Sequence, residues 1–224
     1  MDGTAIALSA RLAGVTLLVL LPLAVLLGRW LAVTRTRFKP WIEGLLALPL
    51  VLPPTVVGYY LLVAMGNQSA LGRLFEALVG HALAFSFGGL VFASVLVNIP
   101  FAVQPVQRAF ESISPDLREA AQCCGLTRWQ VLWRIELPLA WPGLLSAAVL
   151  TFAHTLGEFG VVLMVGGNIP GETQTVAISI YDRTQSFDHA SAGAMAALLL
   201  VISLVTMAVS YGLVERLMRR RRSA

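Results

Sequence analysis

The amino-acid sequence predicts an all-α membrane protein, a polytopic helical bundle of about five transmembrane helices. Of the 224 residues, 57% are apolar and only 12% are charged, and the mean hydropathy is +0.78, which is not typical of a soluble domain. Apolar runs of about 20 residues, enough to cross roughly 30 Å of hydrocarbon as a helix, recur along the chain. The basic residues are also distributed unevenly between the connections, which is typical of a membrane protein with a fixed orientation.

Five segments are long and apolar enough to span a membrane. Four contain no charged residue, whereas residues 142–167 carry His154 and Glu158 inside an apolar run. The five segments are residues 12–27, 44–65, 82–103, 142–167 and 190–214. A further apolar piece, residues 173–181, is too short to span, and we expect it to form a helix or a re-entrant turn at the surface.

The basic residues predict the orientation of these spans. All but three of the 16 basic residues fall on one side of the arrangement, and the exceptions are Arg11, Arg73 and Arg183. Because short cytoplasmic loops accumulate arginine and lysine, we expect the N-terminus outside and the C-terminus inside. The arginine run at residues 219–222 is expected to hold this orientation against anionic lipid, and we expect no binding of nucleic acid.

The composition disfavours enzymatic activity. Lys39 is the only lysine and follows no glycine-rich loop, so the chain lacks the phosphate-binding motif of P-loop ATPases. Cys123 and Cys124 are adjacent, which fits neither a disulfide framework nor a paired metal motif. His154 has no second histidine at the spacing of a zinc-peptidase helix. We therefore expect no catalytic residue, no bound cofactor and no metal in this chain.

The longest connection, residues 104–141, has the signals of two short helices on the cytoplasmic side. Ser114 and Pro115 predict the start of the first helix, because serine caps and proline tolerates the first helical position. Gly125 predicts its end, because glycine adopts the left-handed conformation that follows many helices. The connection is therefore expected to be ordered.

The second helix of this connection should begin at Thr127. Thr127 and Gln130 have the spacing of a capping box, and Pro138 and Pro142 are expected to forbid continuation of the helix. One face of this helix is expected to carry Trp129, Leu132 and Trp133. Such a helical loop predicts either a docking surface for a partner protein or an amphipathic helix that rests in the lipid interface.

Seven residues of this connection resemble, in type and spacing, the EAA signature of type I ABC importer permeases. They are Glu119, Ala120, Ala121, Gly125, Ile135, Leu137 and Pro138. The resemblance favours docking: it implies that the loop couples the chain to a separate ATP-binding subunit, with the Glu-Ala-Ala triplet and Gly125 at the contact. It also implies one permease domain over residues 8–216, with the coupling loop at residues 104–141 inside it.

The same resemblance implies the partners of the chain. A second copy would complete a homodimer in the bacterial cytoplasmic (inner) membrane, and two copies of a cytoplasmic ATP-binding subunit would use ATP and magnesium. An extracytoplasmic oxyanion-binding protein would deliver the substrate, and transport would proceed by alternating access. The alternative of a different class is an ATP-independent secondary transporter or channel, which the lack of an inverted repeat in the sequence disfavours.

Three segments are similar to the molybdate branch of this family. They are residues 48–58, 156–160 and 168–175. The resemblance implies that the chain forms the membrane subunit of a molybdate importer. Permeases for sulfate and thiosulfate share much of the sequence of these segments, so these anions and tungstate are the alternative substrates.

Three prolines interrupt the second span. Pro49, Pro53 and Pro54 remove backbone donors and should break or kink the helix, which membranes tolerate only against protein or a water-filled cavity. A broken helix offers a new N-terminus near Thr55, where free N–H groups favour an anion. The break predicts either a wall of the translocation path or packing curvature alone.

The fourth span carries a polar stripe. Thr151, His154, Thr155 and Glu158 recur at helical spacing and must avoid lipid. The two threonines are expected either to line the path or to bond the carbonyls of their own helix. Glu158 is a poor ligand for a dianion and is expected to act in structure or gating. We expect it to pair with Arg11, which has a similar depth.

Overall fold

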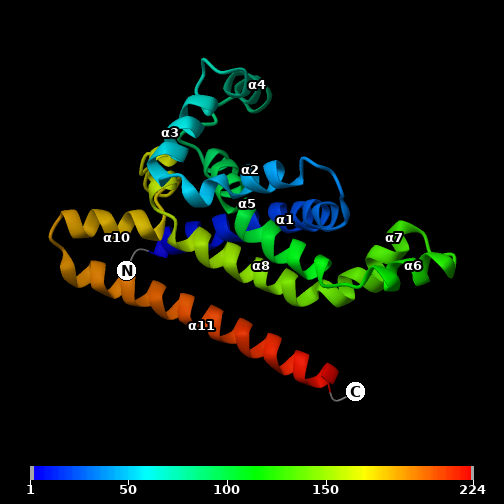
Figure 1. Cartoon of the computed structure of the whole chain (residues 1–224). Coiled ribbons are helices and arrows are strands. Elements are labelled where there is room, and N and C mark those ends of the chain that lie inside the picture. The colour runs from blue at the N-terminus through cyan, green and yellow to red at the C-terminus, as the bar shows by residue number, and fades with distance from the viewer. Residues whose placement is uncertain (1–2, 223–224) are drawn as a thin grey trace.

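The computed structural model describes residues 3–222, with side chains described as far as Val209 and at Gly212. The arginine run at residues 219–222 lies outside the described side chains. Within residues 3–222 the structure is entirely helix, turn and loop (Figure 1). The helices are α1 (Gly3–Val33), α2 (Lys39–Val51), α3 (Pro54–Met65), α4 (Ala70–Val79), α5 (Phe87–Glu111), α6 (Pro115–Cys123), α7 (Arg128–Val131), the π-helical turn η1 (Leu132–Glu136), α8 (Leu137–Gly157), α9 (Gly160–Gly166), α10 (Val176–Gln185) and α11 (His189–Arg222). The all-α prediction is confirmed.

Helices α1, α5 and α8 form the centre of the molecule. Leu20, Leu31 and Phe110 are fully or almost fully buried between them. Glycines set the close approach: a Cβ at Gly28 of α1 would lie 3.0 Å from the backbone nitrogen of Gln107 in α5. A Cβ at Gly143 of α8 would lie 2.7 Å from a carbonyl oxygen of α5. Small residues at helix contacts are typical of membrane bundles, where packing replaces the hydrophobic effect as the driving force.

Four stretches of the described chain are long and apolar enough to cross a membrane, and a fifth arises if one bent pair counts as a single span. The four stretches are Gly3–Val33, Phe87–Glu111, Arg128–Gly157 and His189–Val209. The bent pair is α2 and α3, whose axes differ by 108°. The number of spans therefore agrees with the sequence prediction, and the side that each terminus faces stays a prediction.

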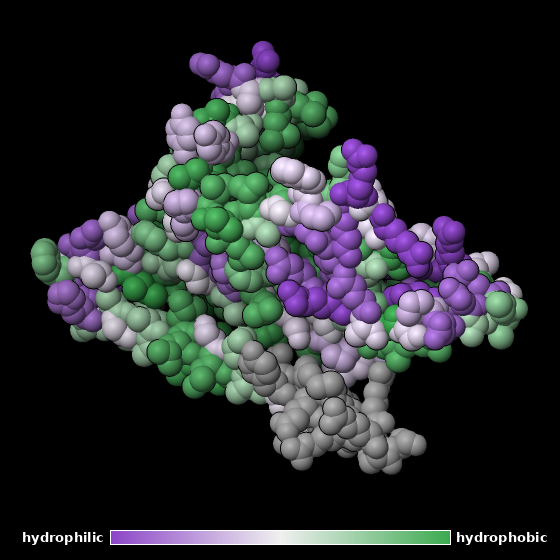
Figure 2. Space-filling model, in the orientation of Figure 1, coloured by the Kyte–Doolittle hydropathy of each residue, from purple (hydrophilic) through white to green (hydrophobic). Residues whose placement is uncertain are grey.

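Hydrophobic and hydrophilic residues are separated on the exterior of the molecule. Figure 2 shows hydrophobic residues gathered over the upper and left middle of this face, and hydrophilic residues around α4, near α10, and in a patch that runs from α6 and α7 toward the middle. In Figure 1 the N-terminus lies at the opposite end of the molecule from α6 and α7. This is the distribution expected of a bundle whose middle contacts lipid or a second protein.

The structure corrects the bounds of the fourth span. The helical stretch begins at Arg128, passes through Pro138 and Pro142, and ends at Gly157, so these prolines do not stop the helix. The physical reason is the π-turn: the N–H of Leu137 donates to the carbonyl of Leu132, five residues earlier. This wider turn relieves the clash between the Pro138 ring and the preceding turn.

The apolar piece at residues 173–181 is also less superficial than expected. It contributes to α10, which packs against α11, α1 and α8, and Ile178 is fully buried. The prediction of a helix there is confirmed, and the prediction of a surface position is wrong for this buried face.

Candidate coupling loop and translocation path

The first helix of the coupling loop, α6, has the ends that the sequence predicts. The Ser114 hydroxyl accepts a hydrogen bond from the Asp116 backbone N–H at 3.3 Å, and Pro115 is the first helical residue. Gly125 has φ +81°, and the N–H of Leu126 reaches back to the Ala121 carbonyl at 3.2 Å. This is a Schellman ending, which needs a residue that adopts the left-handed region without strain.

The second helix, α7, begins with the predicted capping box. The Gln130 backbone N–H donates to the Thr127 hydroxyl at 3.3 Å, and the Thr127 N–H donates to the Gln130 side chain at 2.8 Å. Trp129 and Trp133 are 63% and 67% exposed, whereas Leu132 is buried in the core. The expectation that these three residues share one face is therefore wrong for Leu132, which packs into the hydrophobic core.

The signature residues divide into an exposed group and a packed group. Glu119, Ala120 and Gly125 are exposed on α6 and its turn, and Pro138 is exposed on α8. Ala121 is buried at 7% exposure. Ile135 and Leu137 are half-buried, and Leu137 packs against the hydrophobic core. The part of the signature available to a partner is thus the outer face of α6.

Sequence reasoning missed a buried carboxylate behind this surface. Glu136, in the π-turn, is fully buried, and its two oxygens accept from Arg29 Nε at 2.5 Å and from Arg118 Nε at 2.7 Å. The available signal was a charged residue between the apolar signature residues Ile135 and Leu137, because an acidic side chain beside apolar signature positions must either reach solvent or find partners.

The predicted break in the second span is confirmed. Helix α2 ends before Leu52, which is extended at φ −74° and ψ 140°, and α3 starts at Pro54 after Pro53. The break packs against the start of α9, because a Cβ at Gly160 would lie 2.7 Å from the Pro54 Cβ. Thr55, the second residue of α3, is exposed, so the new helix N-terminus is open at the surface of the protomer.

Glu158 lies at a second break and not in the middle of a helix. It follows the last residue of α8, and its Oε1 accepts a hydrogen bond from the Val161 N–H in the first turn of α9 at 3.0 Å. Its Oε2 lies 3.8 Å from His154 Nε2. The expected pair with Arg11 is not formed, because the Arg11 guanidinium stacks over the Phe87 ring at 4.4 Å.

The polar stripe is only partly brought together. Thr151 and Thr155 are buried inside the protomer at 1% and 2% exposure, and the Thr155 hydroxyl donates to the Thr151 carbonyl at 2.8 Å. His154 and Glu158 instead line a cavity of about 190 Å³ together with Pro54. The two breaks therefore meet at one cavity, whereas the threonines belong to the bundle interior.

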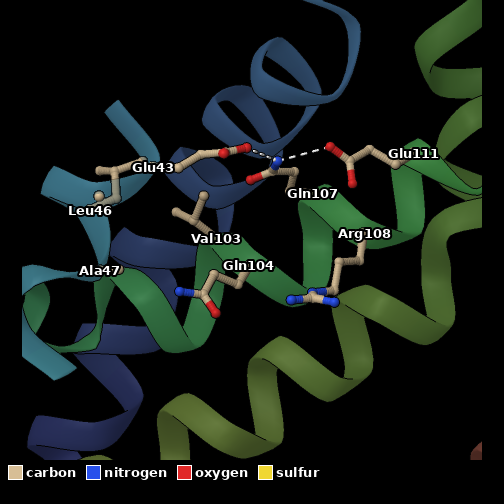
Figure 3. Close-up of a pocket in the computed structure, with 9 residues that line it drawn as sticks. Glu43, Leu46, Ala47, Val103, Gln104, Gln107, Arg108 and Glu111 are labelled. Atoms are coloured by element: carbon tan, nitrogen blue, oxygen red, sulfur yellow. Dashed lines mark hydrogen bonds between the residues drawn. The ribbon is translucent and has the colours of Figure 1, made fainter. Parts of the chain in front are cut away.

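A larger cavity of about 490 Å³ lies between α2 and α5 (Figure 3). The Gln107 side chain bridges two carboxylates there, donating to Glu43 at 2.6 Å and to Glu111 at 2.9 Å. Lys39 Nζ lies 2.9 Å from Glu111 and 3.7 Å from Glu43. Arg108 also lines this cavity, and Figure 3 places its side chain away from the bridge. This network joins the start of α2 to the end of α5, and the sequence prediction did not include it.

Residues 22–223 match the model of a protein family described as the binding-protein-dependent transport system inner membrane component. The chain belongs to this permease family. The permease is 45% identical over 210 residues to the molybdenum transport system permease protein ModB of Azotobacter vinelandii, covering 94% of this chain and 93% of the relative. It is 38% identical over 217 residues to ModB of Escherichia coli strain K12, covering 96% and 93% of the two chains. The predicted resemblance to ABC importer permeases is confirmed.

The permease is also similar to a more distant relative and to a solved structure. A probable sulfate transport system permease protein, cysT of Chlorella vulgaris, is 31% identical over 176 residues, covering 77% of this chain and 66% of the relative. The fold of the permease matches the crystal structure of a bacterial ABC transporter for the polysaccharide alginate, with a TM-score of 0.76 and 21% identity. That match covers 95% of the permease and 78% of the solved chain, and it supports the fold alone.

Proposed function

We propose that the protein is the transmembrane subunit of an ATP-driven importer that moves molybdate across the cytoplasmic membrane by alternating access. The observation that carries this proposal is the 45% identity to a molybdenum permease over 94% of the chain. The sulfate permease is less similar and matches a smaller share of the chain. Molybdate is therefore favoured over sulfate, and thiosulfate and tungstate remain alternatives for the same oxyanion path.

The proposed assembly contains two copies of this chain. Helix α2 contributes no buried residue to the protomer, and Trp41 and Val51 on it are 80% and 82% exposed. An apolar helix that packs so little on its own bundle needs a further surface, and a second copy would supply it beside the path. Two cytoplasmic ATP-binding subunits and an extracytoplasmic oxyanion-binding protein complete the proposed importer. A solved alginate transporter of this fold was crystallised with its periplasmic protein.

The ATP-binding subunit would contact the outer face of α6. Glu119, Ala120 and Gly125 are exposed there, and the Schellman turn fixes their spacing. ATP and magnesium would be used by that subunit, because this chain supplies no phosphate-binding loop. Closure of the ATP-binding subunits can shift the permease only if it favours one of its two states, so the contacts at α6 must differ between the two states.

The proposed path runs along the two helix breaks. Pro53, Pro54 and Thr55 would form its wall, with the open N-terminus of α3 as a weak stabiliser of the passing anion. Glu158 would act as a structural or gating residue, since a second negative charge close to molybdate is costly in low dielectric. Weak contact suits a path, because a deep binding well would slow release.

ATP-dependent uptake of labelled molybdate tests the proposal. Proteoliposomes would hold this chain, its ATP-binding subunit and the binding protein, with excess sulfate, thiosulfate or tungstate as competitor. Uptake that needs ATP and persists in excess sulfate and thiosulfate supports a molybdate importer. Loss of uptake in sulfate would move the assignment to a general oxyanion carrier, and uptake without an ATP-binding subunit would overturn the importer mechanism.

A further inference from the structure

Glu136 is a buried charge that the proposed path and the docking surface do not use. Its side chain is fully buried and each carboxylate oxygen contacts a different arginine, Arg29 at 2.5 Å and Arg118 at 2.7 Å. A buried carboxylate is costly unless charged and polar groups surround it, so this position demands both partners. Glu136 therefore depends on both arginines, and its role follows from the helices to which these arginines belong.

The two arginines come from elements that are far apart in the sequence. Arg29 belongs to α1, and Arg118 belongs to α6, the helix that carries the exposed signature residues. Arg118 also donates to the carbonyl of Phe110, near the end of α5, at 2.6 Å, and Arg29 reaches the carbonyl of Arg128 in α7 at 3.5 Å. One carboxylate thus connects the outer loop to α1 and α8 directly and to α5 through Arg118.

Helix α6 has few other attachments to the bundle. Ala121 is the one residue that α6 buries, and Arg118 lies one turn before it on the same inner face. Glu119 and Ala120 project from the opposite face and are exposed. The outer face of α6 therefore carries the proposed partner contact, and its inner face carries Arg118, which binds Glu136. A force that the partner applies to the outer face would act on the contact between Arg118 and Glu136.

The π-turn places Glu136 for this role. Leu132 and Glu136 at its two ends are both buried, whereas Trp133 and Arg134 between them are exposed. A π-turn inserts one residue into a helix and re-aims the side chains that follow, and such turns are frequent at functional sites. Because the turn continues directly into α8, displacement of Glu136 is displacement of a membrane-spanning helix.

We propose that Glu136 is the joint that carries movement of α6 into α1 and α8, acting as a positioning residue for ATP-driven transport. The paired arginines hold α6 in one geometry relative to the bundle, so that α6 cannot slide without moving both helices. The inference rests on the proposed function, in which α6 receives the ATP-binding subunit. Coupling between distant sites needs a physical element that both sites bias, and this contact is such an element.

The amount of molybdate taken up per ATP hydrolysed tests the joint. In the reconstituted complex, Glu136→Gln keeps the shape of the side chain and removes its charge, and Glu136→Asp keeps the charge on a shorter stem. We expect Glu136→Gln to assemble with the ATP-binding subunit and hydrolyse ATP while uptake per ATP falls by about tenfold. Glu136→Asp should restore part of the ratio. The matched control is Glu76→Gln, an exposed carboxylate on α4 whose loss should leave the ratio unchanged.

Two results would contradict the role proposed for Glu136. One is an unchanged amount of molybdate taken up per ATP hydrolysed in Glu136→Gln. The other is a parallel loss of inserted protein, hydrolysis and uptake in Glu136→Gln, Glu136→Asp and Arg118→Lys alike, which would make the contact a folding anchor only. Failure of the proposed function is separate: wild-type uptake without ATP, or a wild-type chain that binds no ATP-binding subunit, would remove the importer itself. If the wild type couples uptake to ATP hydrolysis and Glu136→Gln does so equally well, only the role proposed for Glu136 is rejected.

Discussion

Glu158 Oε1 accepts a hydrogen bond from the Val161 backbone N–H at 3.0 Å, across the break between α8 and α9. The carboxylate therefore caps the helix that follows it, where the free N–H groups and the helix dipole favour negative charge. This contact explains why Glu158 does not need Arg11, which stacks on Phe87 instead. A charged residue that the sequence places inside a span is satisfied by backbone and not by a distant ion pair.

We predict that Glu158 and Arg11 contribute independently to stability. Glu158→Ala should lower the free energy of unfolding by about 1 kcal/mol through loss of the cap. Because the two side chains do not pair, the double variant with Arg11→Ala should equal the sum of the single variants within about 0.5 kcal/mol. Thermal unfolding of the four proteins in one detergent measures this cycle. A larger coupling term would mean that Glu158 and Arg11 do form an ion pair.

Gly125→Val should abolish uptake while the protein remains inserted and keeps its proposed dimeric state. The left-handed backbone at φ +81° costs a β-branched residue about 1–2 kcal/mol, and its side chain would project from the turn that ends the proposed contact face. Uptake per ATP and size-exclusion chromatography are the measurements. The matched control is Gly80→Val, at φ +82° after α4, which carries the same strain far from α6. Normal coupled uptake in Gly125→Val would contradict the role of the turn.

Gln107→Leu should destabilise the contact between α2 and α5. The side-chain amide is shared by Glu43 and Glu111, so its loss removes a hydrogen bond from each carboxylate, leaves Lys39 as the partner of both, and should cost about 1–3 kcal/mol. Gln104→Leu is the control, since within the described structure its side chain lines the same cavity and makes no hydrogen bond. Thermal unfolding of both variants against wild type decides, and equal losses would show that only cavity polarity matters.

Asp188 should make stability depend on pH at the start of α11. Hydrogen bonds from Ser191, and then Arg183, hold the pKa of the Asp188 carboxyl below its usual value of 3.8. A carboxyl with a lower pKa in the folded state stabilises that state above its unfolded pKa, and this contribution disappears as the pH falls through the folded pKa. The melting temperature of wild type should therefore exceed that of Asp188→Asn near pH 7, and the two should converge below pH 3.8. A constant difference down to acidic pH would exclude the linkage.

The features that the sequence predicted correctly are those that local chemistry determines. The cap at Ser114, the glycine turn at Gly125 and the capping box at Thr127 each involve residues within a few positions of one another. Likewise, adjacent prolines break a helix wherever it packs, so the bend before Pro54 follows from the prolines themselves.

The features that escaped prediction depend on partners distant in the sequence. Glu136 meets Arg29 across 107 positions, and no spacing rule relates them. The π-turn that accommodates Pro138 has no local sequence signal of its own. The sequence therefore wrongly predicts that the helix ends at this proline. The sequence predicts Glu158 as a mid-helix charge because the break after Gly157 lies inside a continuous apolar run, where a hydropathy scan does not register it.

The 108° bend between α2 and α3 also bears on how the protein is made. Pro53 and Pro54 have no backbone N–H, so the helical hydrogen-bond ladder is interrupted after Leu52, and α2 buries no side chain fully in its own protomer. Pro54 packs against α9, but Val51 and Pro53 are exposed, so a newly inserted single copy would present that side of the break to lipid, where unpaired backbone groups are costly. We therefore expect unpaired subunits to be short-lived substrates of membrane proteolysis, so that cellular abundance reports the rate of assembly as much as the rate of synthesis.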